Sequence, residues 1–365
     1  MPKHISSVYV YNISMEKLKL VMTGGGTGGH IVPNLALIPY LKKHFKIFYL
    51  GESGSMEQRL VSKDKEITFV EIPAVKLIRK LTPKNILVPY KLLKAVAFAK
   101  KVLQDIAPNV IFAKGGYVSL PVAMAGKKLN IPILAHESDY SMGLANKIIH
   151  RYAKVMFTSF RETCISDKCI YSGSPIRQEV FSANKEVAEK FCRFQTPKPT
   201  ILFFGGSLGS KNINKFVFDN LDKMDSYNII HFVGRGNAKE TSLPNYCQIE
   251  FAENIYDFFA LSDVVVCRAG ANSIFELLAM HKPMLLIPLS KEASRGDQIE
   301  NANVFKTQGF AEVLEEKDLS FENFSQKVSR LEKNKFFYTS NMKTYNGISA
   351  NNLITKYILD YAKQK

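Results

Sequence analysis

The sequence lacks the features that mark membrane-spanning, zinc-binding and disulfide-stapled proteins. No run of 18 apolar residues occurs, so no membrane-spanning helix is predicted. The first fourteen residues contain no long apolar stretch of the kind found in signal peptides, and we expect Met15, which directly precedes the first predicted strand, to be the natural start. The cysteines are odd in number and form no CxxC pair, which is typical of reduced thiols; they are Cys164, Cys169, Cys192, Cys247 and Cys267.

Acidic residues are too few to balance the basic ones. The chain has 33 Asp and Glu against 49 Lys and Arg, which gives a formal net charge of +16. This excess favours an anionic partner, which can be a nucleic acid, an anionic lipid or a phosphorylated substrate. No zinc finger, RRM signature or clustered aromatic-basic stripe supports a nucleic-acid binder. At 365 residues, of which 46% are hydrophobic, the chain has the size of two ordinary globular domains.

Short apolar runs alternate with longer helical patterns, which is typical of parallel sheets flanked by helices. Most runs are continuously apolar, as in strands buried on both faces. The predicted strands are 17–23, 46–51, 67–72, 110–114, 131–137 and 155–159 in the first half, and 200–206, 229–234, 248–252, 263–268 and 283–289 in the second. The sequence therefore predicts an α/β fold with two doubly wound, Rossmann-like domains.

The two halves begin in the same way, each with a strand, a glycine-rich loop and a helix. The loops are TGGGTGG at 23–29 and FGGSLGS at 204–210. Open α/β sheets bind ligands at the carboxyl ends of their strands, so we expect a cleft between the domains lined by these ends. A Gly/Ser/Pro cluster at 172–177 suggests the boundary. We predict an amino-terminal domain at 1–176 and a carboxyl-terminal domain at 177–348, with an amphipathic helix at 349–365 returning to the first.

The first glycine loop is suited to approach a phosphate closely. Backbone N–H groups at such a turn, and the partial positive charge of the following helix, favour anions. Gly24, Gly26 and Gly29 match the dinucleotide-binding pattern G-x-G-x-x-G, and Glu52 resembles its ribose-binding acid. His30 and the second glycine loop argue against a nicotinamide enzyme. The other alternative is that both loops are only tight turns, although so many glycines are entropically costly unless close approach is needed.

Seven motifs follow one another with ordinary spacing between about residues 18 and 303. They are GGGTGGHIVPNLAL, KGGYVSLPV, HESDYSMGLANK, GSPIR, FGGSLGSKNIN, CRAGANSIFELL and RGDQIENANVF. Through them the chain resembles the MurG family of glycosyltransferases (family 28), whose fold is the two-domain GT-B arrangement. The resemblance implies inverting transfer of N-acetylglucosamine from UDP to the C4 hydroxyl of undecaprenyl-linked muramoyl-pentapeptide in peptidoglycan synthesis. It also implies that no metal or other cofactor is needed, and that the enzyme works at the cytoplasmic face of the cell membrane.

The acceptor side of the predicted site lies in the first half. His30 is the candidate base, because an imidazole near its ordinary pKa can take a hydroxyl proton at physiological pH. Glu137 ends a buried strand and is the alternative base. A structural hydrogen bond for His30, or a strand-capping role for His136 and Glu137, is the competing interpretation. The resemblance adds acceptor contacts at His136, Tyr117, Asn146 and Asp139, although many relatives carry an amide where this chain has Asp139.

The donor side draws on both halves. Glu276 is placed to accept the ribose hydroxyls, although Ser273 to Glu276 also reads as a capping box. Arg177 and Ser207 fit contacts with the diphosphate. The Ser174 that precedes Pro175 departs from the asparagine common in the family. Besides Glu276, Arg177 and Ser207, the positions that match the family's donor site are Thr27, Gly28, Gly29, Ala252, Ala271, Asn272, Ser273, Ile274, Phe275 and Gln298.

One segment combines basic and apolar residues without any acid. From Ile72 to Gln104 the basic residues are Lys76, Arg79, Lys80, Lys84, Lys91, Lys94, Lys100 and Lys101. Apolar residues such as Leu77, Leu87, Tyr90 and Leu93 lie among them. This mixture is what a peripheral anchor on an anionic leaflet needs, at about 1 kcal/mol per basic residue. We expect one face of the segment to pack against the domain and the other to present charge.

Two alternatives to this assignment are kept. Another GT-B nucleotide-sugar transferase, such as one that glycosylates diacylglycerol, would share the fold and the donor. A nicotinamide-dependent oxidoreductase would rest on the glycine fingerprint alone.

Overall fold

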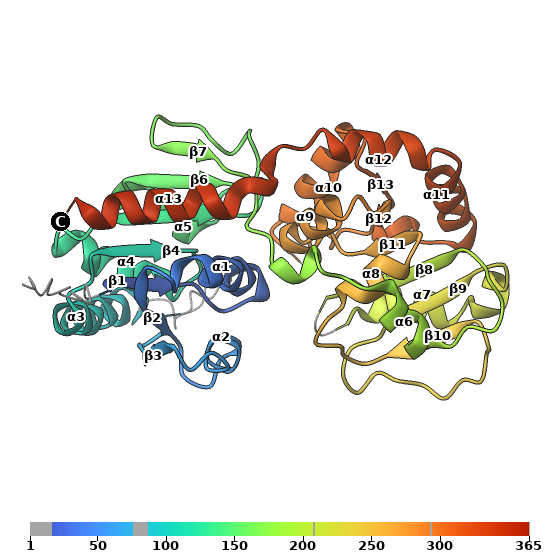
Figure 1. Ribbon diagram of the computed structural model, residues 1–365, viewed down its shortest axis with the longest axis horizontal. Helices are drawn as coiled ribbons and strands as arrows, with labels where there is room; N and C mark the ends of the chain where they lie inside the picture. The colour runs from blue at the N-terminus through green and yellow to red at the C-terminus, as the bar shows by residue number, and fades with distance from the viewer. Residues whose placement is uncertain (1–16, 76–86, 207–208, 293, 365) are drawn as a thin grey trace, which may run out of the picture.

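The computed structural model describes residues 17–75, 87–206, 209–292 and 294–364. Two parallel sheets, each covered by helices, lie side by side, and the chain crosses between them after β7 and again before α13 (Figure 1). Met15 and the residues before it, Lys76, Arg79, Lys80, Lys84 and Ser207 lie outside the described residues.

The first sheet has the strand order β3-β2-β1-β4-β5-β6-β7 among the described residues. Its strands are β1 (Leu18–Thr23), β2 (Phe45–Gly51), β3 (Ile67–Glu71), β4 (Val110–Ala113), β5 (Ile133–Glu137), β6 (Val155–Thr158) and β7 (Cys169–Tyr171). The helices between them are α1 (Gly28–Leu41), α2 (Met56–Val61), α3 (Val88–Ile106), α4 (Ser119–Lys128) and α5 (Leu144–Tyr152). All pairings are parallel, which requires the helical crossovers that the sequence pattern predicted.

The second sheet has the strand order β10-β9-β8-β11-β12-β13. Its strands are β8 (Thr200–Phe204), β9 (Asn228–Phe232), β10 (Tyr246–Ile249), β11 (Val264–Cys267), β12 (Met284–Leu286) and β13 (Ala311–Val313). The helices are α6 (Lys185–Cys192), α7 (Lys211–Phe218), α8 (Tyr256–Leu261), α9 (Ala271–Ala279), α10 (Asp297–Thr307), α11 (Phe321–Lys333), α12 (Lys335–Lys343) and α13 (Ala350–Lys363). The predicted α/β fold with two doubly wound sheets is confirmed.

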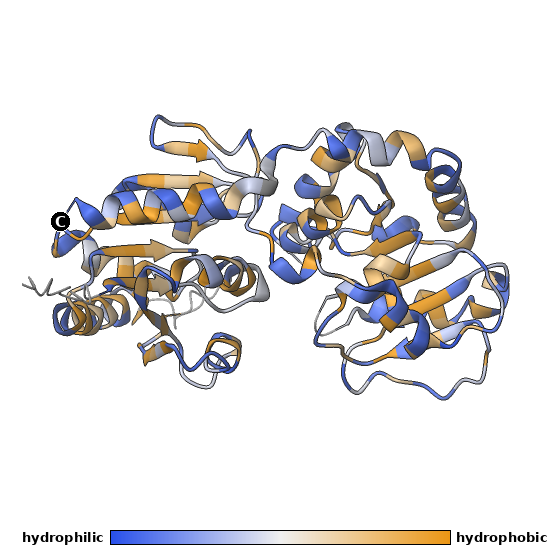
Figure 2. Ribbon diagram, viewed as in Figure 1, coloured by the Kyte–Doolittle hydropathy of each residue, from blue (hydrophilic) through white to orange (hydrophobic). Residues whose placement is uncertain are grey.

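The central strands are apolar along most of their length because both of their faces are buried, although β1 carries Lys19 and β5 ends in His136 and Glu137 (Figure 2). On β1, Leu20 and Met22 pack in one apolar core and Val21 in another, as the period of two along a strand requires. The eleven predicted strands all form. β7 and β13 were not predicted, because these edge strands have three residues each and their apolar runs are too short to stand out.

The last helix crosses back to the first sheet. In Figure 1, α13 runs along the half of the molecule that contains β1 and β4, and its residues Ala350, Ile354 and Ile358 share a core with Leu20. In its first turn, the Asn351 side chain accepts a hydrogen bond from Ile176 N at 3.2 Å and donates one to Ile176 O at 2.7 Å. These contacts hold the end of the chain against the connection between the halves. The predicted division at residue 176 stays a prediction.

Candidate active site

The predicted site residues lie where strands end. The first glycine loop follows β1, and the loop with Lys114 follows β4, its neighbour in the first sheet. In the second sheet, β8 and β11 are neighbours in the same way. Strand order reverses at both places, and such switch points open a crevice at the carboxyl ends of the strands. The topology therefore places both glycine loops at the ligand-binding edge of their sheets.

The first glycine loop contains glycines of two kinds. A Cβ on Gly24 would come within 2.8 Å of the Lys114 Cβ, and Gly26 has φ +87°, so the fold itself needs both to be glycine. Gly28, by contrast, has open space where a Cβ would stand, and a Cβ on Gly29 would meet only Thr27 Oγ1 at 3.4 Å. The tight-turn interpretation accounts for Gly24 and Gly26, and it leaves Gly28 and Gly29 with room for a ligand.

His30 lies in the first turn of α1, directly over this loop. Its Nδ1 is within hydrogen-bonding distance, 2.9 Å, of Thr27 Oγ1. Burial, reinforced by the Lys114 ammonium, lowers the pKa of His30 to about 4. The imidazole is therefore neutral at pH 7. Its pKa is not near the ordinary value that the sequence analysis expected, so burial makes His30 a weaker proton acceptor than an exposed histidine.

Glu137 is held rigidly at the end of β5. Its Oε2 accepts hydrogen bonds from Gly143 N and Asn146 Nδ2, both at 2.9 Å, and its Oε1 accepts one from Asp139 N at 3.1 Å. The strand thus delivers a buried carboxylate whose oxygens are fixed by donors of its own loop. A strand cap would make the same hydrogen bonds, so the catalytic role of Glu137 stays a prediction beside the capping one.

One pocket of about 140 Å³ brings His30 and Glu137 together. Its wall is formed by His30, Gly116, Glu137, Gly143, Leu144, Ala145, Asn146 and Arg295. Arg295 comes from the second half of the chain, in the loop before α10, so the pocket is built by both halves. An imidazole, a carboxylate and a guanidinium therefore line one small cavity.

Of the other predicted acceptor residues, Asn146 is part of the wall of this pocket, whereas His136, Tyr117 and Asp139 are not. His136 is fully buried, and its Nε2 lies 3.2 Å from Gly173 O. Tyr117 donates from its hydroxyl to Glu52 Oε2 at 2.6 Å and packs under Gly26. The Asp139 carboxylate accepts hydrogen bonds from Arg295 and Asn301 of the second half. Their predicted contacts with the acceptor stay predictions.

On the donor side, the amino terminus of α9 touches the first glycine loop. Asn272 Nδ2 donates to Gly28 O at 3.1 Å across the two halves. The helix begins at Ala271 with Gly270 as its N-cap, and no side chain caps it. The capping-box interpretation of Ser273 and Glu276 is therefore wrong, because Ser273 lies inside the first turn, where its side chain cannot act as N-cap.

Glu276 is nearly buried, at 5% exposure, and sits in a cluster with two partners. Its Oε1 accepts hydrogen bonds from the Tyr256 hydroxyl at 2.7 Å and from Arg177 Nε at 3.1 Å. The guanidinium of Arg177 also lies over the Tyr256 ring, 4.8 Å from its centroid. The structure thus brings together Arg177 and Glu276, which the sequence analysis assigned to the diphosphate and the ribose, and adds Tyr256 between them.

The remaining donor predictions are distributed as follows. Asn272 and Ser273 are partly exposed, whereas the side chains of Ile274 and Phe275 belong to the apolar core. Gln298 is the second residue of α10, and its Oε1 accepts a hydrogen bond from Leu289 N at 3.1 Å. The other donor candidates that the structure describes are Thr27, Gly28 and Gly29 at the first loop, Ala252 after β10 and Ala271 at the start of α9.

Sequence reasoning missed three residues at the site. Arg295 was visible only as part of the motif RGDQIENANVF, and Lys114 as the first residue of KGGYVSLPV. Tyr256 gave no signal, because an aromatic residue in an apolar helix is usually a core residue. Within the described ranges, no three His, Cys, Asp or Glu side chains are gathered as a metal site requires.

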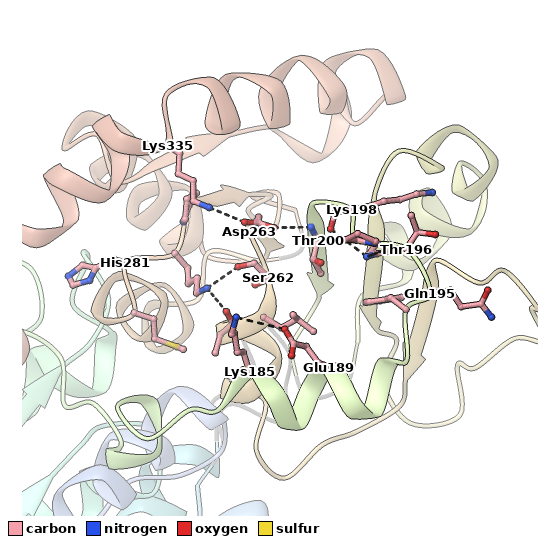
Figure 3. Close-up of a pocket in the computed structure, with 18 residues that line it drawn as sticks. Lys185, Glu189, Gln195, Thr196, Lys198, Thr200, Ser262, Asp263, His281 and Lys335 are labelled. Atoms are coloured by element: carbon pink, nitrogen blue, oxygen red, sulfur yellow. Dashed lines mark hydrogen bonds and ion pairs between the residues drawn. The ribbon is translucent and has the colours of Figure 1, made fainter.

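A larger pocket of about 680 Å³ lies away from these residues (Figure 3). Its wall includes the residues directly before β8, β11 and β12, so it opens at the amino-terminal edge of the second sheet. Its charged groups are largely engaged with one another: Lys335 pairs with Asp263 at 2.9 Å, and Lys282 donates to Ala260 O and Ser262 O. None of the predicted site residues lines it.

Known proteins match the chain along most of its length. The Glycosyltransferase family 28 N-terminal domain matches residues 20–158, and the corresponding C-terminal domain matches residues 200–356. A relative from Clostridium botulinum (strain Alaska E43 / Type E3) is 43% identical over 358 residues, which cover 96% of this chain and 100% of the relative. It is named UDP-N-acetylglucosamine--N-acetylmuramyl-(pentapeptide) pyrophosphoryl-undecaprenol N-acetylglucosamine transferase.

Two further comparisons agree with this match. A relative from Bacillus thuringiensis (strain Al Hakam), with the same name followed by the numeral 3, is 44% identical over 349 residues, covering 93% of this chain and 99% of the relative. The crystal structure of Acinetobacter baumannii MurG superimposes with a TM-score of 0.74 at 25% identity, covering 94% and 99% of the two chains. The resemblance and the GT-B fold that the seven motifs indicated are confirmed.

Proposed function

Because the chain belongs to glycosyltransferase family 28 and, within it, to the MurG transferases, we propose that it transfers N-acetylglucosamine from UDP to undecaprenyl-pyrophosphoryl-linked muramoyl-pentapeptide. The acceptor group is the C4 hydroxyl of the muramoyl sugar, and the product is a precursor of peptidoglycan. The names of the relatives support both substrates.

The chemistry follows from the residues that face the pocket. The acceptor oxygen attacks the anomeric carbon, the bond from that carbon to the UDP oxygen breaks, and UDP leaves with the electron pair. The hydroxyl proton passes to a base, for which neutral His30 and the fixed carboxylate of Glu137 are the two candidates. A single displacement of this kind inverts the anomeric centre.

The leaving diphosphate gains negative charge as this bond breaks. The amino terminus of α9 lies next to the first glycine loop, because the Asn272 side chain donates to Gly28 O, and helix polarity favours an anion at such an end. Arg177 supplies a cation that is held by Glu276 of the same helix. Helix polarity and a guanidinium can thus take the place of a metal ion in this site.

The single observation that carries the proposal is the joining of two half-sites. Asn272 of α9 bonds to Gly28 of the first loop, while His30 and Glu137 share one pocket with Arg295 from the other half. We accordingly assign residues 1–176, with α13, to the acceptor and residues 177–348 to the donor. A sugar held by the donor half would then lie next to the base of the acceptor half.

A transfer assay tests this function. Purified protein is given UDP-N-acetylglucosamine and a short-chain lipid-linked muramoyl-pentapeptide in the presence of a chelator. We expect transfer by the wild type and a loss of at least a hundredfold in His30→Ala, because removing a general base costs this much. Transfer to diacylglycerol alone would identify the other GT-B activity, and thermal protection by NAD instead of UDP would support the oxidoreductase.

We also propose that the first domain binds the membrane surface through α3. One face of this helix packs inward through Ala95, Val96, Ala99 and Leu103. The opposite face exposes Tyr90, Leu93 and Phe98 together with Lys91, Lys94 and Lys101. Leu93 is 61% exposed, which is unusual for a leucine on a packed helix.

Apolar side chains among lysines favour the interface of an anionic leaflet. Among the described helices, none has the length and apolar character to cross a bilayer. Sedimentation with anionic vesicles tests the proposal: Leu93→Glu combined with Lys94→Glu should reduce binding about tenfold or more, whereas Lys128→Glu on α4 serves as the control. Equal sedimentation of the three proteins would contradict a role for α3.

A further inference from the structure

Asp139 connects the two halves of the molecule. Its Oδ2 forms an ion pair with Arg295 NH2 at 2.7 Å, and its Oδ1 accepts a hydrogen bond from Asn301 Nδ2 at 3.1 Å. Both partners belong to the second half of the chain, on the loop before α10 and on α10 itself. The next residue, Tyr140, extends this contact, because its N–H donates to Asn301 Oδ1 at 2.9 Å.

The same residue also reaches the candidate base. The backbone N–H of Asp139 donates to Glu137 Oε1 at 3.1 Å, so one residue joins the second half to the carboxylate in the pocket. Arg295 also contacts a backbone segment that holds Glu137. It lines the pocket and lies against Gly143, where an added Cβ would be 2.7 Å from its NH1. Gly143 N is itself a donor to Glu137 Oε2. Both oxygens of Glu137 are thus fixed by backbone groups that the second half contacts.

We infer that Asp139 and Arg295 are positioning residues for the transfer reaction: their ion pair aligns Glu137 with the donor half only while the two halves are in contact. The inference rests on the proposed function. A carboxylate binds a guanidinium strongly, because the hydrogen bonds between them are assisted by opposite charges.

The charges around Asp139 are consistent with an ion pair at neutral pH. Burial, reinforced by the carboxylates of Glu137 and Asp297, raises the pKa of Asp139 to about 6, against the lowering effects of Asn301 and Arg295. Lys114 adds a further positive charge nearby. The carboxylate is therefore ionised at pH 7 and able to pair with Arg295.

A double-mutant cycle tests the inference. Asp139→Ala, Arg295→Ala and the double variant are compared in the transfer assay, and UDP binding is measured by calorimetry as a check of folding. We expect each single variant to lower kcat at least tenfold, and the double variant to be no worse than the more damaged single one, because the two residues act as one unit. The KM for UDP-N-acetylglucosamine and the Kd for UDP should change less than twofold. Asp139→Asn, which keeps one acceptor oxygen, should lose less kcat than Asp139→Ala.

The exposed pair of Lys63 and Glu253, at 3.0 Å, provides a matched control across the same two halves. Lys63→Ala should leave kcat unchanged, because exposed ion pairs contribute little. Three results would each overturn the inference. They are losses of kcat that multiply in the double variant, an unchanged kcat in Asp139→Ala, and a rise in the Kd for UDP as large as the loss of kcat.

Small-angle scattering gives a readout that does not depend on transfer. Asp139→Ala, Arg295→Ala and the double variant should increase the radius of gyration equally, and Lys63→Ala should not. If the wild type transferred no sugar at all, the proposed function would fail while this measurement would still decide whether the ion pair holds the halves together. An unchanged radius of gyration in all variants would show that the ion pair does not hold the two halves together.

Discussion

Replacing Lys114 with methionine should stabilise the protein at neutral pH. The Lys114 side chain is fully buried at the end of β4, and its Nζ has no hydrogen-bond partner among the described residues. Burial lowers the pKa of Lys114 to about 8, although the carboxylates of Glu137 and Asp139 act in the opposite direction. Methionine has a similar length and carries no charge, so it removes the cost of burying an unpaired ammonium.

The size of the effect follows from the pKa. The ordinary value for lysine is 10.5 and the folded protein lowers it to about 8, and a difference of one in pKa corresponds to about 1.4 kcal/mol. The charged form therefore destabilises the folded state by about 3 kcal/mol at pH 7. Because the folded-state pKa is the lower one, this penalty is fully present below pH 8 and fades as the pH rises toward 10.5. At pH 10 it is about 1 kcal/mol.

Urea denaturation at pH 7 and pH 10 measures both values. The free energy of unfolding of Lys114→Met should exceed that of the wild type by about 3 kcal/mol at pH 7 and by about 1 kcal/mol at pH 10. Lys128→Met on α4 is the control, since Lys128 is exposed and its replacement should change stability by less than about 0.5 kcal/mol. Taking differences between proteins at one pH cancels the titration of all other groups.

Two results would refute this reasoning. A Lys114→Met protein that is less stable than the wild type at pH 7 would mean that the ammonium is well paired in the folded state. A gain in stability of equal size at both pH values would mean that packing, and not charge, is responsible.

Three further predictions concern other parts of the site and the core. Since burial and the Lys114 ammonium lower the pKa of His30 to about 4, its imidazole should stay neutral down to about pH 5; NMR titration of labelled histidine checks this, and a midpoint near 6.5 would contradict it. Tyr256→Phe should weaken UDP binding on the order of tenfold in calorimetry, because it removes the hydroxyl that donates to Glu276; an unchanged Kd would show that Glu276 is held without it. Phe160→Ala should lower the free energy of unfolding by about 3 to 5 kcal/mol in urea, because the ring packs against Phe275 and Phe305 in the core; a loss below about 1 kcal/mol would place this ring outside the cooperative core.

The sequence determined the fold class and the positions where ligands can bind. Short continuous apolar runs that alternate with helical patterns favour strands buried on both faces, and a glycine loop between such a strand and a helix lies at the carboxyl end of the sheet. These local rules placed His30 at the first loop and Glu137 at the end of β5 without coordinates. The edge strands β7 and β13 escaped them, since three residues carry too little periodic signal.

The tertiary structure alone decided which side chains meet. Arg295 is 156 residues from Asp139 and Glu276 is 99 residues from Arg177, so no local pattern could join them. The burial of Lys114 likewise depends on neighbouring strands and on the glycine loop above it. Ion pairs, pocket walls and pKa shifts all depend on distances in space, whereas a sequence pattern carries only distances along the chain. Patterns along the chain therefore predicted where the candidate site lies, and only the contact between the two halves showed which side chains form it.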